Sequence, residues 1–301
     1  MNANWLIVRL RALRAFSLPV SVLPVVAAAA AVRPPAEWNR LVLALSAIGA
    51  ACFHLAGNLL NDYFDYRSGA DSRTRDDAGR PGRGLLRGEL APADVLAEAA
   101  AFLLAAVAVS VALVFLCGPR LLWFAAGAGA GAYAYTGPPL KLKHRAMGEA
   151  MIFLLFGPLL MTGAAFAQTG RIEPATLLLS VPIGMATTAI LVGNNLRDAA
   201  EDARAGVRTL AHLAGGRAAA WLYVLLTFGS AVFLAATAAA GLAPWPLVFT
   251  PVLLVLLARP LACIRGARRL PDIDVRTARF VAAELAVVIA VLATMGPLTV
   301  R

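Results

Sequence analysis

The feature that most constrains this chain is the length of its apolar segments, which recur in blocks of about 20 residues. An α-helix of that length crosses the hydrocarbon core of a bilayer. The composition agrees, because 60% of the 301 residues are hydrophobic and only 15% are charged, whereas a soluble domain is about half apolar and a quarter charged. The sequence therefore predicts an all-α, polytopic membrane protein, which we treat as a single domain over residues 1–301.

Nine segments are predicted to span the membrane. They are residues 17–33, 39–60, 93–116, 120–136, 148–167, 174–195, 219–240, 245–262 and 277–298. Similar polar clusters follow the second and the sixth of these segments, four spans apart. This spacing predicts two four-helix halves plus one helix around a central cavity, with membrane lipids surrounding the spans.

Basic residues alternate between the predicted loops. The loops after spans two, four, six and eight are basic and cover residues 67–87, 141–145, 197–217 and 259–279. Because Lys and Arg collect on the cytoplasmic side, we expect the N-terminus and these loops in the cytoplasm and the C-terminus outside, in a bacterial inner membrane. This topology and an anionic substrate are the two explanations for the net charge of +10, and we expect no nucleic-acid partner.

Acid and amide side chains form two clusters at the ends of the second and sixth spans. The first cluster comprises Asn58, Asn61, Asp62 and Asp65, and the second comprises Asn194, Asp198 and Asp202. Members of each cluster are three or four residues apart, so they share a helix face. Carboxylates at that spacing repel one another, and a cation relieves the repulsion.

The type of these residues favours a magnesium site. Mg²⁺ binds a few carboxylates together with water and substrate phosphate oxygens, so two facing clusters would hold a diphosphate through the metal. Arg83 and Lys141 lie in the predicted basic loops, on the same side of the membrane as the clusters, and would neutralise the remaining phosphate charge. The alternative interpretation is that these are helix-end polar residues that bond to nearby arginines.

At these residues the sequence resembles the UbiA superfamily of intramembrane aromatic prenyltransferases. NDYFDYRSGAD at 61–71 and GNNLRDAAEDARAGVRTLAHLAG at 193–215 are similar to its two Asp-rich motifs. Within the superfamily, these two motifs are most similar to the MenA-type 1,4-dihydroxy-2-naphthoate polyprenyltransferases, as are RPGRGLLRG at 80–88 and YTGPPLKLKHRAMGEAMIFLLFGP at 135–158. Gly69 stands where the 4-hydroxybenzoate branch has an aspartate, and Glu149 stands where a Gly-Asp pair is often seen.

This resemblance implies Mg²⁺-dependent transfer of a polyprenyl group from a polyprenyl diphosphate to an aromatic acceptor. The implied metal ligands are Asp62, Asp65, Asp198 and Asp202. The implied diphosphate-binding residues are Asn58, Asn61, Asn194, Arg83 and Lys141. Asp71 would serve the acceptor or its proton. With 1,4-dihydroxy-2-naphthoate as acceptor, as in menaquinone biosynthesis, carbon dioxide would also be lost.

Two alternatives stay open at this point. Other members of the superfamily use 4-hydroxybenzoate, homogentisate, or a haem or chlorophyll precursor, and the Asp-rich motifs do not separate these acceptors. A membrane transporter would also have repeated halves, but its site is expected near the midplane, whereas these acids gather at the membrane edge. Of the histidines, we expect His54 to be packed and hydrogen-bonded and His144 to be solvated in its basic loop.

Overall fold

The computed structural model describes residues 3–68, 84–204, 209–265 and 272–299, and every regular element in these ranges is a helix. In chain order these are α1 (Ala3–Ala12), η1 (Ala15–Ser17), α2 (Pro19–Val32), η2 (Pro35–Glu37), α3 (Arg40–Ser68), α4 (Pro92–Cys117), α5 (Leu121–Thr136), η3 (Leu142–His144), α6 (Gly148–Leu154), η4 (Leu155–Leu159), α7 (Leu160–Thr169), α8 (Pro174–Arg204), α9 (Leu210–Ala214), α10 (Gly216–Ala239), η5 (Trp245–Leu257), α11 (Ala258–Arg265) and α12 (Ile273–Met295).

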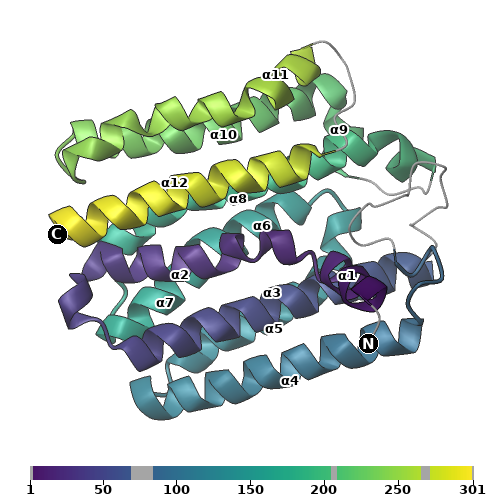
Figure 1. The fold of residues 1–301 in the computed structure, drawn as a ribbon, viewed down its shortest axis with the longest axis horizontal. Coiled ribbons are helices and arrows are strands. Elements are labelled where there is room, and N and C mark those ends of the chain that lie inside the picture. The colour runs from purple at the N-terminus through teal and green to yellow at the C-terminus, as the bar shows by residue number, and fades with distance from the viewer. Residues whose placement is uncertain (1–2, 69–83, 205–208, 266–271, 300–301) are drawn as a thin grey trace.

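The long helices lie side by side in one bundle (Figure 1). Eight of the described segments are long and apolar enough to cross a membrane. The 16-residue helix α5 is the additional segment that the sequence predicted, and at 1.5 Å per residue it is about 24 Å long. The prediction of an all-α membrane bundle with about nine spans is therefore confirmed.

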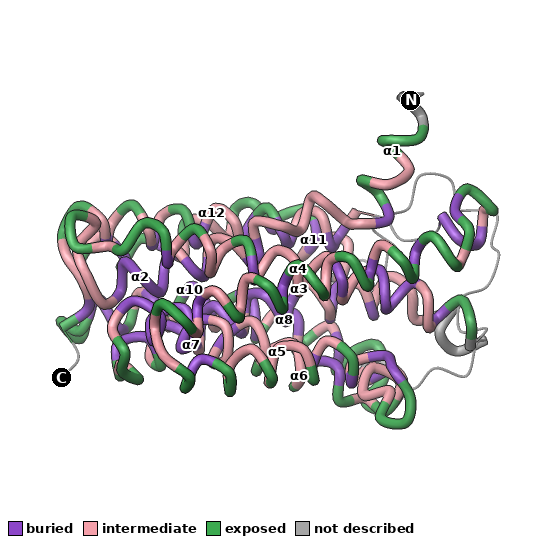
Figure 2. Tube along the Cα trace, turned by 90° about the horizontal axis from the view of Figure 1, so that it is seen from below, coloured by how far each residue is buried: buried purple, intermediate pink, exposed green. Residues whose placement is uncertain are grey.

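Burial follows the pattern expected of a bundle whose outer face meets lipid. Buried residues lie toward the inside of the bundle, and exposed residues lie on its outer faces (Figure 2). The central helix α8 is the most deeply packed, with 72% of its apolar window buried. Phe115 on α4 and Trp123 on α5 are at least 80% exposed. Such exposure is expected on a face that contacts lipid, because lipid tails are as apolar as these side chains.

Helix α3 continues to Ser68, eight residues past the predicted end of the span. The additional turns keep an apolar face, because Tyr63 and Phe64 pack against the buried cluster that contains Leu59 and Leu60 at the end of the predicted span. The first acid cluster consequently lies on the last turns of a continuous helix. Helix α8 similarly runs to Arg204, past its predicted end at residue 195.

The predicted span 148–167 is interrupted in its middle. Helix α6 gives way to the π-helical segment η4, which contains Pro158, and the chain continues as α7. Proline has no backbone N–H and cannot maintain the regular α-helical ladder. A Cβ at Gly157 would lie 2.6 Å from the Ser180 carbonyl oxygen, so glycine allows η4 to pack directly against α8.

The N-terminal segment approaches the bundle from outside it. Helix α1 projects from the end of the bundle at which α3 finishes (Figure 2), and the C-terminus lies at the opposite end (Figure 1). Between α1 and η1 the chain turns at Arg14, whose φ of 51° lies in the left-handed region. This turn brings Arg14 to the end of the bundle that carries the acid clusters.

Candidate functional site

A cavity of about 360 Å³ lies inside the bundle, between α2, α3 and α5 on one side and α6, η4, α7 and α8 on the other. On α3, both Ser46 and Asp65 line it. These residues are 19 positions apart, so the cavity extends along about 28 Å of the helix at 1.5 Å per residue. Acids, amides and cations line one end, which we call the polar end. Further along, the walls are mostly apolar and include Phe53, Phe124 and Phe156.

The first acid cluster forms one side of the polar end. Asn58, Asn61, Asp62 and Asp65 all line the cavity from the last turns of α3. The carboxylates of Asp62 and Asp65 are buried, with 5% and 4% of each residue exposed. Charged groups are rarely buried to this degree unless they are paired. Each of these two carboxylates accordingly has a cationic partner from another part of the chain.

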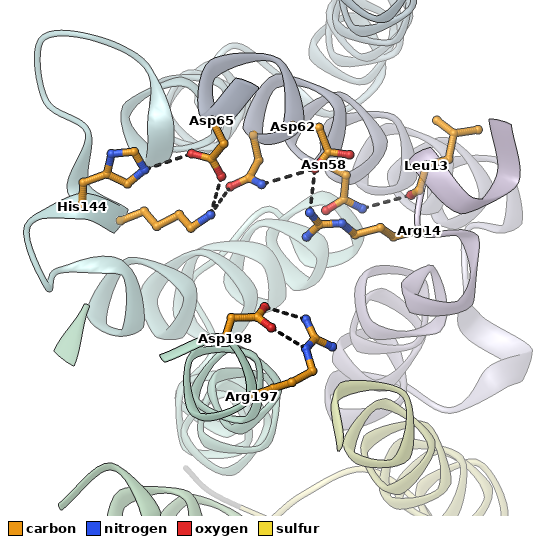
Figure 3. A network of polar contacts seen from close by, with 10 residues as sticks. Leu13, Arg14, Asn58, Asp62, Asp65, His144, Arg197 and Asp198 are labelled. Carbon is orange, nitrogen blue, oxygen red and sulfur yellow. Dashed lines mark hydrogen bonds and ion pairs between the residues drawn. The ribbon is translucent and has the colours of Figure 1, made fainter. Parts of the chain in front are cut away.

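Asp62 pairs with Arg14. Arg14 Nη2 donates to Asp62 Oδ1 over 2.7 Å (Figure 3). Burial lowers the pKa of Arg14, but the charge of Asp62, its hydrogen bond and the neighbouring Tyr135 and Asp65 together raise the pKa above its ordinary value. Beside this pair, Asn58 Nδ2 donates to the Leu13 carbonyl oxygen over 3.1 Å, which fixes the turn that carries Arg14.

Asp65 pairs with Lys143 and His144. Lys143 Nζ donates to Asp65 Oδ2 over 2.6 Å and to Asn61 Oδ1 over 3.0 Å. His144 Nε2 lies 2.9 Å from Asp65 Oδ1 (Figure 3). Burial lowers the pKa of Lys143, but the charge of Asp65 and their hydrogen bond raise it well above the usual range. His144 is thus a partner of the first cluster and not the solvated loop residue that we expected.

The second cluster lies across the cavity on α8 (Figure 3). Arg197 donates two hydrogen bonds to Asp198, from Nε to Oδ1 and from Nη2 to Oδ2, each 2.8 Å long. Its remaining nitrogen, Nη1, lies 2.8 Å from Asp274 Oδ2 at the start of α12. Asn194 Oδ1 and Asp274 Oδ1 are buried and have no hydrogen-bond partner among the described residues. Two acceptor oxygens at the polar end are therefore able to accept a hydrogen bond or to bind a cation.

The structure brings together most of the residues that the sequence predicted for this site. Asn58, Asn61, Asp62, Asp65, Asn194 and Asp198 all line the cavity. Asp71 and Arg83 lie outside the described residues, and Asp202 lies on α8 with a side chain that the structure does not describe. Lys141 is not among the residues that line the cavity, and Lys143 occupies the place expected for it.

Five residues of the polar end were not predicted from the sequence: Arg14, Lys143, His144, Arg197 and Asp274. Arg197 lies inside the second motif directly before Asp198, and Lys143 and His144 lie inside the quoted stretch 135–158. Arg14 and Asp274 lie outside every quoted stretch. The neighbouring amide of Asn195 has a different partner, since its Nδ2 donates to Glu149 Oε1 over 2.8 Å. That bond ties α8 to α6.

The donor set of the polar end fits Mg²⁺. Among the described residues, no three His, Cys, Asp or Glu side chains lie close enough to hold a metal as a group. Mg²⁺ does not require such a cage, because it keeps several waters and takes its other ligands from one or two carboxylates and substrate phosphates. The buried, unpartnered Asn194 Oδ1 and Asp274 Oδ1 add hard oxygen atoms of the kind that this ion prefers.

The charge balance points the same way. The described lining residues include three cations, Arg14, Lys143 and Arg197, and four carboxylates, Asp62, Asp65, Asp198 and Asp274. The net charge of these seven groups is one negative. A diphosphate would be repelled by such a surface unless divalent cations entered with it.

The sequence matches a known protein family and several relatives. A sequence model of the UbiA prenyltransferase family matches residues 21–281. The chain is 34% identical over 227 residues to the "UbiA prenyltransferase domain-containing protein 1 homolog" of Drosophila melanogaster. It is also 34% identical over 224 residues to the human "UbiA prenyltransferase domain-containing protein 1". These matches cover 73% and 72% of this chain but only 61% and 64% of the relatives' length.

Two solved structures share the fold. A UbiA homolog from Archaeoglobus fulgidus, bound to GPP and Mg²⁺, superimposes with a TM-score of 0.68 at 15% identity and covers 95% of this chain and 99% of its own. The apo structure of a UbiA homolog from Aeropyrum pernix K1 superimposes with a TM-score of 0.64 at 18% identity, over 90% and 96% of the two chains. At these identities the likeness establishes the architecture alone.

Proposed function

Because the chain belongs to the UbiA prenyltransferase family, we propose that it transfers a polyprenyl group from a polyprenyl diphosphate to an aromatic acceptor with the help of Mg²⁺. One observation carries this proposal. A single cavity joins a ring of carboxylates and cations to a largely apolar space along about 28 Å of α3. That shape matches a substrate with a small anionic head and a long apolar tail.

The carboxylates would hold the metal. Asp62 and Asp65 from α3 and Asp198 from α8 line the polar end, and we propose Asp202, one turn further along α8, as the fourth ligand. When bound, Mg²⁺ stabilises the negative charge that develops on a leaving diphosphate. Asn58, Asn61 and Asn194 would orient water or phosphate oxygens beside these ligands.

The cations would hold the diphosphate itself. Arg14, Lys143 and Arg197 each pair with a carboxylate in the structure, and each would exchange that partner for a phosphate oxygen. Such charge-assisted hydrogen bonds are about twice as strong as neutral ones, and they strengthen as the C–O bond breaks. Lys141 and Arg83, and Asp71 as a group serving the acceptor, stay proposals that rest on the motif resemblance.

We propose 1,4-dihydroxy-2-naphthoate as the acceptor, in a menaquinone-type reaction with loss of carbon dioxide. The support is the resemblance to the MenA-type branch at 61–71 and 80–88, together with Gly69 in place of the aspartate of the 4-hydroxybenzoate branch. The relatives' names state the family and leave the acceptor open. 4-Hydroxybenzoate, homogentisate, and haem or chlorophyll precursors are the competing acceptors.

We also propose that the polar end faces the cytoplasm of a bacterial inner membrane. The alternation of basic and nearly uncharged loops supports this orientation. Labelling of a cysteine introduced at exposed Arg145, against one introduced at exposed Gly170 in the loop before α8, would report which end is cytoplasmic.

The test is turnover by the purified full chain in detergent. Mg²⁺, a polyprenyl diphosphate and 1,4-dihydroxy-2-naphthoate are supplied, and the prenylated product is detected by mass. We expect product, and we expect a chelator or Asp198→Ala to abolish it. Asp94→Ala is the matched control, because Asp94 is an exposed acid on α4 that does not line the cavity.

The outcomes separate the levels of the proposal. Turnover with a competing acceptor but not with the naphthoate would keep the reaction and discard the acceptor. A folded protein that turns over no aromatic acceptor would contradict the enzyme reading and favour a transporter.

A further inference from the structure

We propose that His54 is the general base of the reaction, and that it accepts the hydroxyl proton of the aromatic acceptor inside the cavity. This inference rests on the proposed function and names the residue that contacts the acceptor. The first observation is how far into the cavity His54 lies along α3. His54 lines the cavity one helical turn before Asn58 and two turns before Asp62, about 6 Å and about 12 Å along the helix axis.

That depth is where the reaction has to occur. The carbon that is attacked carries the diphosphate, so it lies just inside the polar end once the head is bound there. The acceptor ring must approach this carbon to about 3–3.5 Å, on the apolar side of the diphosphate. The other described titratable side chains that line the cavity are Arg14, Asp62, Asp65, Tyr135, Lys143, His144, Arg197, Asp198 and Asp274, which belong to the polar end. His54 is the one that lies a full turn deeper.

The hydrogen bonds around His54 fix its tautomer. Ser17 has a single hydroxyl proton, and its Oγ donates this proton to the Arg14 carbonyl oxygen over 2.7 Å. The same Oγ lies 3.0 Å from His54 Nε2, so this second contact requires Ser17 to accept and Nε2 to carry the hydrogen. Neutral imidazole has one N–H only, so Nδ1 has the lone pair of a base.

Nδ1 is also the atom that the protein leaves unpaired. It is buried and has no hydrogen-bond partner among the described residues. A buried polar atom without a partner destabilises the folded protein, and a ligand that brings a hydroxyl to the cavity would remove this cost. The ring is held edge-on against Phe156, with centroids 5.3 Å apart and planes at 80°, so its orientation is set before the acceptor arrives.

Proton transfer to His54 precedes formation of the C–C bond. The O–H proton of the acceptor moves to Nδ1, and the resulting oxyanion makes the ring carbon nucleophilic. A C–C bond forms to the prenyl carbon as its C–O bond breaks, and the electron pair leaves with the diphosphate. The attacked ring carbon then loses its proton to solvent, or loses carbon dioxide where it carries a carboxylate. The oxygen of the restored aromatic ring takes the proton back from His54.

The first variant is His54→Gln, whose amide N–H can still reach Ser17 but cannot serve as a base. We expect the maximal turnover rate to fall by about 10²–10⁴-fold, the usual contribution of general base catalysis. Binding of a non-reactive prenyl thiolodiphosphate with Mg²⁺ should stay at the wild-type value. His212→Gln is the matched control, because His212 does not line the cavity.

An acceptor series distinguishes a base from a structural role. With acceptors whose hydroxyl is progressively more acidic, we expect the defect of His54→Gln to shrink, since less help is needed to remove the proton. Ser17→Ala keeps the histidine and removes only the group that fixes its tautomer, and we expect about a tenfold loss that follows the same trend. This second variant decides the matter if His54→Gln fails to bind the thiolodiphosphate.

Equal turnover by His54→Gln and wild type, or a defect that is constant across the series, would overturn the role of His54 while leaving the proposed function intact. Absence of turnover in the wild type with every aromatic acceptor would overturn both.

Discussion

Lys143 offers the sharpest test of the polar end, because the sequence pointed to Lys141, two residues earlier. Lys143 Nζ bonds to Asp65 and Asn61, and its side chain is 20% exposed. Lys141 is not among the residues that line the cavity. We predict that Lys143→Met weakens binding of a prenyl diphosphate in the presence of Mg²⁺ by more than Lys141→Met does.

The size of the effect follows from two opposing contributions. A hydrogen bond to a charged group contributes about 1.5–3 kcal/mol, which corresponds to about 10- to 150-fold in Kd. In the wild type, however, Lys143 must first leave Asp65, and the variant does not bear that cost. We therefore expect a value near the lower limit, about tenfold.

The same substitution has a second consequence for the protein without ligand. Removing one partner of a buried ion pair costs about 3–5 kcal/mol, and Asp65 retains His144 as a described partner, so the loss should be partial. A bound cation relieves the unpaired carboxylate, and a ligand that binds only the folded state raises stability. Mg²⁺ alone should therefore raise the Tm of Lys143→Met by more than it raises that of the wild type.

The pKa of Lys143 also determines how this stability difference depends on pH. A lysine with a raised folded-state pKa contributes stability that is lost only as the pH rises through that raised value. Lys143 therefore stays charged from about pH 6 to about pH 9, and the difference between variant and wild type should be flat over that range. The assay is thermal unfolding in detergent with and without Mg²⁺, together with binding of the thiolodiphosphate. Equal affinities for the two methionine variants would refute the placement of Lys143.

Three further predictions concern other contacts. Asp274→Asn removes the charge of the buried carboxylate that positions Arg197 Nη1 beside the proposed metal site, so the affinity for a prenyl diphosphate with Mg²⁺ should fall by about tenfold, as measured by titration. Glu284→Gln should leave the Tm unchanged, since the amide keeps the hydrogen bond to its serine partner on α10, whereas alanine there should cost about 2 kcal/mol in denaturant titration. Gly157→Ala should destabilise the protein by about 1–3 kcal/mol, because its Cβ would lie 2.6 Å from a carbonyl oxygen of α8. Gly129→Ala, whose Cβ would meet its nearest neighbour at 3.5 Å, should change stability by less than about 0.5 kcal/mol.

The sequence predicted those parts of the site that depend on helical periodicity. Asn58 and Asp62 are four residues apart on one continuous helix, so their shared face could be read directly. Lys141 and Lys143 lie in a short irregular connection around η3, where no period decides which side chain enters the cavity. The backbone at Lys141 is left-handed, with a φ of 45°, and this turn determines which side chain enters the cavity. The residue types in this connection do not indicate such a turn.

The pairing of acids with cations could not be read from the sequence for a different reason. Arg14 is 48 residues from Asp62, and Arg197 reaches Asp274 on the last helix. Contacts of this kind depend on how helices pack, and the apolar periodicity of a span does not specify its neighbour. Arg14 precedes the first predicted span and lies outside both acid clusters, so its position in the sequence does not indicate that it lines the cavity.

The pairing itself has a physical reason that links the fold to the proposed chemistry. A site that binds a metal diphosphate needs several carboxylates close together, and without a ligand these would repel one another in a buried place. Buried charges persist only when they are paired. The chain meets this need with cations from three separate segments, the turn before α2, the η3 connection and α8. If metal takes the carboxylates as we propose, the same cations become available to the diphosphate, so ligand binding would exchange one set of ion pairs for another.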